Sequence, residues 1–381
     1  MGPQMGKKPN AKNQREDAMR RNNTTPRQLA VALAAGIIGA AALAGTTGAQ
    51  QMRDVTFIVV NNLFSAPAYV AAENGYWGKQ GLNVAVKLTG SGRAVTQAVR
   101  AGDAQFGHAA LSTTIASARA GGNMLKGAVA YYNNSAYIAK AGGRAIIGRK
   151  DRGIDAKNPK SMEGKKIAYL TGSTNDVYLR AWFRKNHLDI SKSTLVSVPV
   201  ENMPITIAQG LVDAIAPWEP YTAQAVRELG ANAVVVSRGE EGLVTDVIGA
   251  VANEDWIKKN YDFTEKFATG IAEATAFVRK HPKETVDIAT RYLDGLNVQD
   301  GVNAMKFLDW DPRLSVCTIE GLVSTGNDMI KTGLLKKSTP FVADDFYDGT
   351  VFKRIVDKHP EFFSDLPPLP KTLADCKGKL S

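Results

Sequence analysis

Apolar and polar residues alternate along the chain in blocks that predict strands and helices in turn. Residues 55–60 form a β-branched and apolar run, typical of a strand buried in a parallel sheet, and residues 82–88 predict a second strand. Between them, residues 67–74 predict a short helix that begins at a proline and has Gly75 just past its end. Strands and helices keep alternating afterwards, which predicts an α/β fold with mostly parallel strands.

Two stretches of the chain share one pattern of a helix, a glycine, a strand and a loop of small or polar residues. They span residues 94–114 and 205–220, about 108 residues apart, a distance that favours two similar lobes over a solenoid repeat. Charged and turn residues at 148–164, and again the segment 242–249, predict crossings between the lobes. We therefore expect residues 50–149 in lobe 1, 150–245 in lobe 2, and 246–381 in the rest of lobe 1 with a C-terminal extension.

The first 49 residues differ in composition from the rest of the chain. They carry seven lysines and arginines against two acids, followed by an uncharged, alanine-rich run at 29–45 and small residues at 47–49. This order predicts a secretory signal peptide with translation starting at Met1 or Met19, and so a periplasmic protein. A membrane anchor is the competing interpretation, but the apolar run is short and weakly hydrophobic for a span.

The composition excludes several classes of protein. The formal charge of +10 falls to +5 without the leader, which argues against a nucleic-acid binder. The four histidines, His108, His187, His281 and His359, lack the spacing of metal ligands, and no phosphate-binding P-loop or nucleophile elbow is present. We therefore expect no metal, no cofactor and no covalent catalysis. Cys317 and Cys376 form either one disulfide or two buried thiols, and the sequence leaves both open.

Three loops follow a predicted strand and open a predicted helix, which is where open α/β sheets place their ligands. They are residues 90–93, 112–114 and 171–175. Exposed N–H groups at a helix start attract an anion, although serine and threonine at these positions are also ordinary helix caps. Arg93 and Trp218 are further candidates for contact with a ligand. Glu219 would repel an anion, so we expect it to hold the hinge or the opposite lobe by hydrogen bonds unless the ligand carries an amine.

The stretch 66–84 resembles the opening signature of the nitrate/sulfonate/taurine type (NMT1/THI5-like) of ABC-transporter substrate-binding proteins. Residues 90–92, 101–106, 162–168, 172–174 and 210–220 resemble later landmarks of that family in the same order, and the resemblance weakens beyond residue 307. It implies a two-lobed type II periplasmic binding protein fold, a small-molecule ligand in the interlobe cleft, a monomer without enzymatic activity, and delivery to an inner-membrane ABC permease with its ATPase. The pocket positions that it implies are Phe64, Ser65, Ser91, Gly92, Arg93, Ser112, Thr113, Ser173, Thr174, Trp218 and Glu219.

The ligand class stays open at this stage. A sulfonate, taurine or nitrate leads, and Arg93, which stands where the family more often has a small residue or proline, is compatible with an anion. The family also includes binders of pyrimidines and aromatic acids, and a related enzyme of thiamin-pyrimidine synthesis whose cysteine-rich run is missing here. A sensor-type binding protein that presents its ligand to a receptor is a further alternative, because fold does not determine function.

Overall fold

The computed structural model describes residues 52–134, 142–240 and 243–376. The expected signal peptide at 1–49, with its two candidate start positions, lies outside these residues. Within them, no helix has both the length and the apolar character needed to cross a bilayer.

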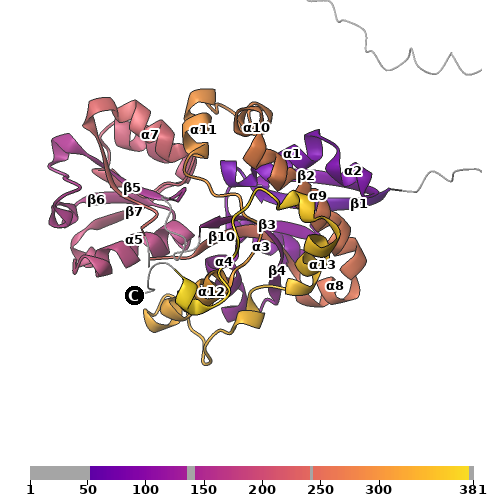
Figure 1. Ribbon diagram of the computed structural model, residues 1–381. Helices are drawn as coiled ribbons and strands as arrows, with labels where there is room; N and C mark the ends of the chain where they lie inside the picture. The colour runs from indigo at the N-terminus through magenta and orange to yellow at the C-terminus, as the bar shows by residue number, and fades with distance from the viewer. Residues whose placement is uncertain (1–51, 135–141, 241–242, 377–381) are drawn as a thin grey trace, which may run out of the picture. The chain divides into compact units, whose positions relative to one another are not determined.

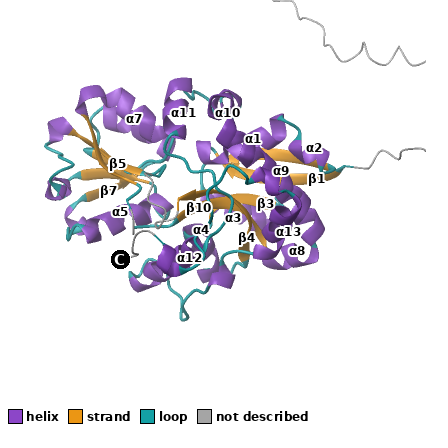
Figure 2. Cartoon of the chain, viewed as in Figure 1, coloured by secondary structure: helices purple, strands orange, loops and turns teal. Residues whose placement is uncertain are grey.

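The strands of the described chain form two five-stranded sheets (Figures 1 and 2). The first has the order β2 (Leu82–Thr89), β1 (Arg53–Val60), β3 (Phe106–Ala110), β10 (Asp246–Asn253) and β4 (Leu125–Asn134). The second has the order β7 (Thr194–Ser197), β6 (Lys166–Tyr169), β8 (Ala214–Ile215), β5 (Ala145–Arg149) and β9 (Ala233–Arg238).

The two sheets are built to the same plan. Three neighbouring strands pair in parallel, and the fourth, β10 or β5, pairs antiparallel with both of its neighbours. Four strands in each sheet therefore run one way, which agrees with the expected mostly parallel architecture. Each reversed strand is the first that the chain forms after it crosses between the sheets: β5 follows β4 of the first sheet, and β10 follows β9 of the second.

The repeated pattern in the sequence corresponds to equivalent places in the two sheets. Its first copy includes α3 and β3, and its second includes α6 and β8, each leading to the third strand of its sheet. The strand β5 ends at residue 149, before the expected boundary, yet it pairs in the second sheet. The chain thus enters the second sheet earlier than its charged segment at 148–164 suggested.

The helices α1–α7 are interspersed among the strands, and α8–α13 follow the last strand. They are α1 (Ala66–Glu73), α2 (Tyr76–Lys79), α3 (Gly92–Ala101), α4 (Thr113–Ala120), α5 (Thr174–Lys185), α6 (Met203–Ala208), α7 (Tyr221–Leu229), α8 (Glu254–Lys259), α9 (Tyr261–Lys280), α10 (Pro282–Ala289), α11 (Val298–Met305), α12 (Val316–Lys331) and α13 (Gly349–Lys358). Short 3-10 helices include η1 (Leu63–Ser65) and η7 (Ala343–Asp345). Figure 1 shows α7 and α5 on opposite sides of the second sheet.

Aromatic residues make the centre of the core beside the first sheet. Phe106 of β3 stacks on Phe267 of α9 with ring centroids 3.8 Å apart, and the indole nitrogen of Trp77 donates a hydrogen bond to the Phe267 carbonyl at 3.0 Å. On the α3 side of β3, a Cβ atom at Gly107 would lie 2.4 Å from Val95, so glycine is needed for the close approach of α3. This approach sets the start of α3 at the end of the sheet.

A disulfide joins Cys317, in the first turn of α12, to Cys376, with Cα atoms 5.7 Å apart. Of the two states that the sequence left open, the structure has the disulfide. It ties the last described residues to the helix whose far end leads to the cavity described next.

Candidate functional site

A cavity of about 720 Å³ lies at the carboxyl ends of the parallel strands and takes residues from both sheets. Val60 ends β1 and Phe64 follows it, the first turn of α3 follows β2, and His108 belongs to β3. From the second sheet come residues 170–174, which follow β6, and Trp218, which follows β8. This is the place where open α/β folds bind ligands.

The cavity brings together most of the pocket residues that the resemblance implies, and adds others. Phe64, Ser91, Gly92, Arg93, Ser173, Thr174 and Trp218 line it, whereas Ser65, Ser112, Thr113 and Glu219 do not. Thr114, from the candidate loop 112–114, also lines the cavity, and the lining residues that sequence reasoning missed include Asn62, Thr96, Gln97, His108, Ser117, Arg144, Leu170, Ile248, Leu334 and Leu335.

The first turns of α3 and α5 begin in the cavity wall, and a serine caps each of them. Ser91 Oγ accepts a hydrogen bond from the backbone N–H of Ala94, and Ser173 Oγ accepts one from Asp176, both at 3.3 Å. The capping role considered for these serines is therefore real. It leaves the earliest N–H groups of each helix, such as those of Gly92 and Thr174, without a backbone acceptor among the described residues. Such groups carry partial positive charge and can bind an anion.

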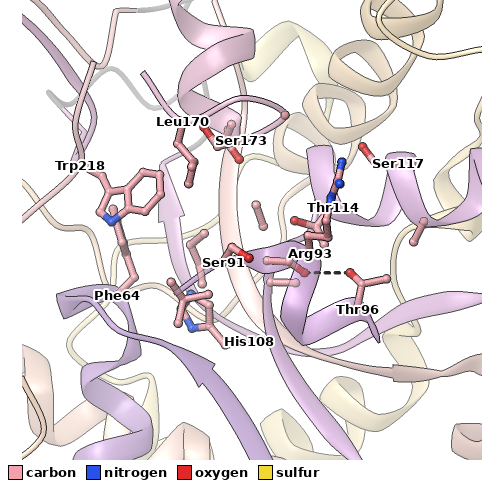
Figure 3. Close-up of a pocket in the computed structure, with 18 of the residues that line it drawn as sticks. Phe64, Ser91, Arg93, Thr96, His108, Thr114, Ser117, Leu170, Ser173 and Trp218 are labelled. Carbon is pink, nitrogen blue, oxygen red and sulfur yellow. Dashed lines mark hydrogen bonds between the residues drawn. The ribbon is translucent and has the colours of Figure 1, made fainter. Parts of the chain in front are cut away.

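The charged side chains that line the cavity are two arginines. Arg93 is exposed and makes no ion pair with a described residue, and Figure 3 shows it beside Thr114 and Ser117. Arg144 is buried, donates to Asn175 Oδ1 at 2.6 Å, and has its guanidinium carbon 6.0 Å from the centre of the Phe64 ring. No aspartate or glutamate belongs to the described lining, so the cavity favours an anion.

The opposite end of the cavity is aromatic and apolar. Figure 3 shows Trp218, Phe64 and Leu170 together at one end, away from Arg93, Thr96 and Ser117. The Trp218 side chain is buried, and its indole N–H has no acceptor among the described residues. Because this nitrogen is sealed from the cavity, the indole offers a ligand its apolar ring and not its N–H.

Thr113 joins the two halves of the structure at the cavity edge. Its hydroxyl lies 2.6 Å from the hydroxyl of Thr174, which links the first turn of α4 to the first turn of α5. Both threonines are buried. Thr113 thus contacts a lining residue rather than the cavity itself.

The other three implied positions are buried beside the cavity. Ser65 donates to the Val60 carbonyl at 2.7 Å, and Ser112 is buried with its hydroxyl unpaired among the described residues. Glu219 pairs with Arg238 at 2.6 Å and accepts from the N–H of Ala223. Burial raises the pKa of Glu219, although the charge of Arg238 opposes the rise. Arg238 is the last residue of β9, where the chain leaves the second sheet. The ion pair of Glu219 therefore fixes the end of β9, and Glu219 does not line the cavity.

The described side chains contain no group of three or more histidines, cysteines, aspartates or glutamates arranged to hold a metal ion.

Comparison with known proteins identifies the family. The profile of the NMT1/THI5 like family matches residues 62–285, more than half of the chain. A protein of Brucella abortus named as a binding protein is 23% identical over 300 residues, which cover 74% of this chain and 86% of that protein. The binding protein YtlA of Bacillus subtilis is 23% identical over 236 residues, covering 61% of this chain and 68% of YtlA.

Solved structures show the same fold. The periplasmic aliphatic sulphonate binding protein SsuA of Escherichia coli superposes with a TM-score of 0.64 at 16% identity, over 79% of this chain and 99% of SsuA. The periplasmic nitrate-binding protein NrtA of Synechocystis gives a TM-score of 0.63 at 14% identity, over 84% of this chain and 92% of NrtA. The chain therefore has the two-lobed fold of periplasmic binding proteins and belongs to the NMT1/THI5-like family.

Proposed function

We propose that the protein is the periplasmic solute-binding component of an ABC importer and binds a small organic anion in the cavity between its lobes. The observation that carries the proposal is the charge of the lining, which has two arginines and no carboxylate among the described residues. The helix starts at Gly92 and Thr174 add partial positive charge on both sides of the cavity.

The size and the apolar end of the cavity favour an organic ligand over an inorganic one. A volume of about 720 Å³ is in the range of pockets for organic ligands, so nitrate alone would leave most of it to water. Trp218, Phe64 and Leu170 offer an apolar wall to a carbon chain or ring. A sulfonate or carboxylate with an aryl or alkyl group uses both ends.

The comparisons support binding and transport as the role. The related chains are named as binding proteins, and SsuA and NrtA are periplasmic proteins that bind sulphonate and nitrate. By extension, we propose that this chain is also located in the periplasm, as its basic and apolar leader predicts. We propose further that it delivers its ligand to a membrane permease with its ATPase.

Closure of the lobes around the ligand is the proposed mechanism. An anion that contacts the start of α3 and the start of α5 at once is bound more tightly when the lobes are close, so it shifts the population toward the closed form. The hydrogen bond between Thr113 and Thr174 links the same two halves and supports this mechanism.

A thermal-shift screen of the purified protein, followed by calorimetry, tests the proposal. The compounds are benzenesulfonate, hexanesulfonate, taurine, benzoate, nitrate and an aminopyrimidine, and the protein is first refolded to remove any bound ligand. We expect the aryl and alkyl anions to raise the melting temperature. At a ligand concentration of one hundred times Kd, binding should add about 2.7 kcal/mol to the free energy of unfolding. A shift with the aminopyrimidine alone would instead support the pyrimidine alternative and contradict the proposal.

A further inference from the structure

His108 is a buried histidine in the wall of the cavity, and its chemistry is unused by the contacts described so far. It lies in β3, is 2% exposed, and lines the cavity near Ser91 (Figure 3). Its Nδ1 atom has two hydroxyl neighbours, Tyr131 at 2.6 Å and Ser65 at 3.1 Å. One ring nitrogen is thus engaged by the protein.

The hydrogen-bond partners of the two hydroxyls decide which ring nitrogen carries the proton. The Ser65 hydroxyl makes its shortest bond, 2.7 Å, to the Val60 carbonyl, which can only accept, so the single serine proton is directed there. The Tyr131 hydroxyl is fully buried, and His108 is its hydrogen-bond partner among the described residues.

Tyr131 keeps its proton, because burial raises the pKa of the phenol well above its ordinary value. A buried hydroxyl proton without an acceptor costs about 1–3 kcal/mol, and Nδ1 is the acceptor in reach. Tyr131 therefore donates to Nδ1. Burial also lowers the pKa of His108 to about 3, so the ring is neutral near pH 7 and its one proton is on Nε2.

The Nε2 atom has no hydrogen-bond partner among the described residues, yet it is not one of the sealed polar atoms of the structure. Since His108 lines the cavity, we infer that its Nε2–H donates a hydrogen bond to an oxygen of the bound solute, with Tyr131 as the positioning residue that holds the proton on Nε2. This inference rests on the proposed binding of an anion in the cavity. It adds a selection rule, because Nε2–H can meet a sulfonate or carboxylate oxygen but cannot accept from an ammonium or amino group.

Nitrogen-15 NMR of the imidazole tests the positioning by Tyr131 without any ligand. We expect the free protein to show the Nε2–H tautomer, and Tyr131→Phe to shift the ring toward a mixture of tautomers with the fold intact by circular dichroism. An Nδ1–H tautomer in the wild-type protein would overturn the inference.

Calorimetry with benzenesulfonate tests the contact itself. His108→Phe keeps a planar ring and removes the donor, so we expect the affinity to fall about tenfold or more, whereas His108→Gln, which keeps an N–H, should lose less. In the wild-type protein, benzenesulfonate should also move the Nε2 resonance. If the wild-type protein binds none of the anions, the proposed function fails. If it binds benzenesulfonate and His108→Phe binds equally well, only this inference fails.

Discussion

Arg93 stands in the first turn of α3, where a cation opposes the partial positive charge of the helix start. Its side chain is exposed at the cavity and has no carboxylate partner among the described residues. An unfavourable position of this kind makes sense when a bound anion offsets it. We therefore propose that Arg93 serves ligand binding and not folding.

We predict that Arg93→Ala weakens the binding of benzenesulfonate by about tenfold or more, equal to about 1.4 kcal/mol, while the free protein keeps or slightly gains stability. Calorimetry gives the affinity, and a thermal melt without ligand gives the stability. Arg100→Ala is the matched control, because Arg100 is exposed in the last turn of the same helix. Equal affinities for wild type and Arg93→Ala would remove Arg93 from the site.

Glu254 shows how a charged residue holds the first sheet to the segments around it. Its carboxylate lies 2.6 Å from Arg119 and 3.6 Å from Lys126, and both of these cations also reach the η7 segment, through Asp345 and Asp344. Burial alone would raise the pKa of Glu254, but hydrogen bonds from Lys258 and Arg119 and the charge of Lys126 hold it at about 2, against an ordinary 4.5.

A lowered pKa in the folded state stabilises the protein above the pKa of the unfolded state. The contribution of Glu254 should therefore be complete above about pH 4.5 and be lost as the pH falls toward 2. We predict that Glu254→Gln is less stable at neutral pH and loses less stability across this acid range. Urea unfolding at several pH values checks this, with Glu320→Gln, an exposed site on α12, as control. Parallel pH curves for wild type and Glu254→Gln would contradict it.

The segment after α12 brings the C-terminal part of the chain into the cavity. Leu334 and Leu335 line it although they lie beyond residue 285, where the match to the family profile ends. Their partly buried side chains pack against the core and add apolar surface to the wall. These residues extend the cavity wall beyond the part of the chain that the family profile matches.

We predict that the double substitution Leu334→Ala with Leu335→Ala weakens hexanesulfonate binding about tenfold and leaves methanesulfonate nearly unchanged, since each buried CH₂ contributes about 0.8 kcal/mol. Competition calorimetry measures the ratio of the affinities for hexanesulfonate and methanesulfonate in the wild type and in the variant. Val342→Ala, at an exposed site further along the chain, is the control. An equal loss for both anions would mean that the leucines do not contact the apolar group.

Elements with a strong local pattern could be predicted from the sequence, and their pairing could not. The runs at 55–60 and 82–88 are β1 and β2 nearly to the residue. The first is a continuous β-branched and apolar run because β1 is an inner strand, and the second alternates in part because β2 is an edge strand with exposed positions. The reversed strands β5 and β10 have equally apolar sequences, and their direction follows from the path of the chain between the sheets.

The same limit applies to the cavity. Ser91 and Ser173 could be found because helix starts have a local signature, whereas His108 looks like any residue of a buried strand and Leu334 looks like a residue of the core. The contact between Tyr131 and His108 joins residues of different strands, and the spacing of residues along the chain does not predict such a contact.

The disulfide between Cys317 and Cys376 closes a loop of the whole C-terminal part, with the cysteines 59 residues apart. Cross-links of this length stabilise mainly by reducing the freedom of the unfolded chain. We predict that Cys317→Ser with Cys376→Ser lowers the free energy of unfolding by about 2–4 kcal/mol. Urea unfolding with and without reductant checks it, because reductant should bring the wild-type protein to the level of the variant. A variant as stable as the oxidised wild type would contradict the prediction.

The place of β10 between β3 and β4 has a consequence for the order of folding. The second sheet uses strands from residues 145 to 238, a continuous stretch, whereas the first sheet lacks an inner strand until residues 246–253 are available. Contacts between distant residues form slowly, so amides of β6 and β8 should gain protection from hydrogen exchange before those of β3 and β4 in a pulse-labelling experiment. Protection of both sheets in one step would contradict this. If the chain is exported unfolded, as proposed, the first sheet cannot close until two thirds of the chain has emerged, so the folding of this sheet waits until translocation is well advanced.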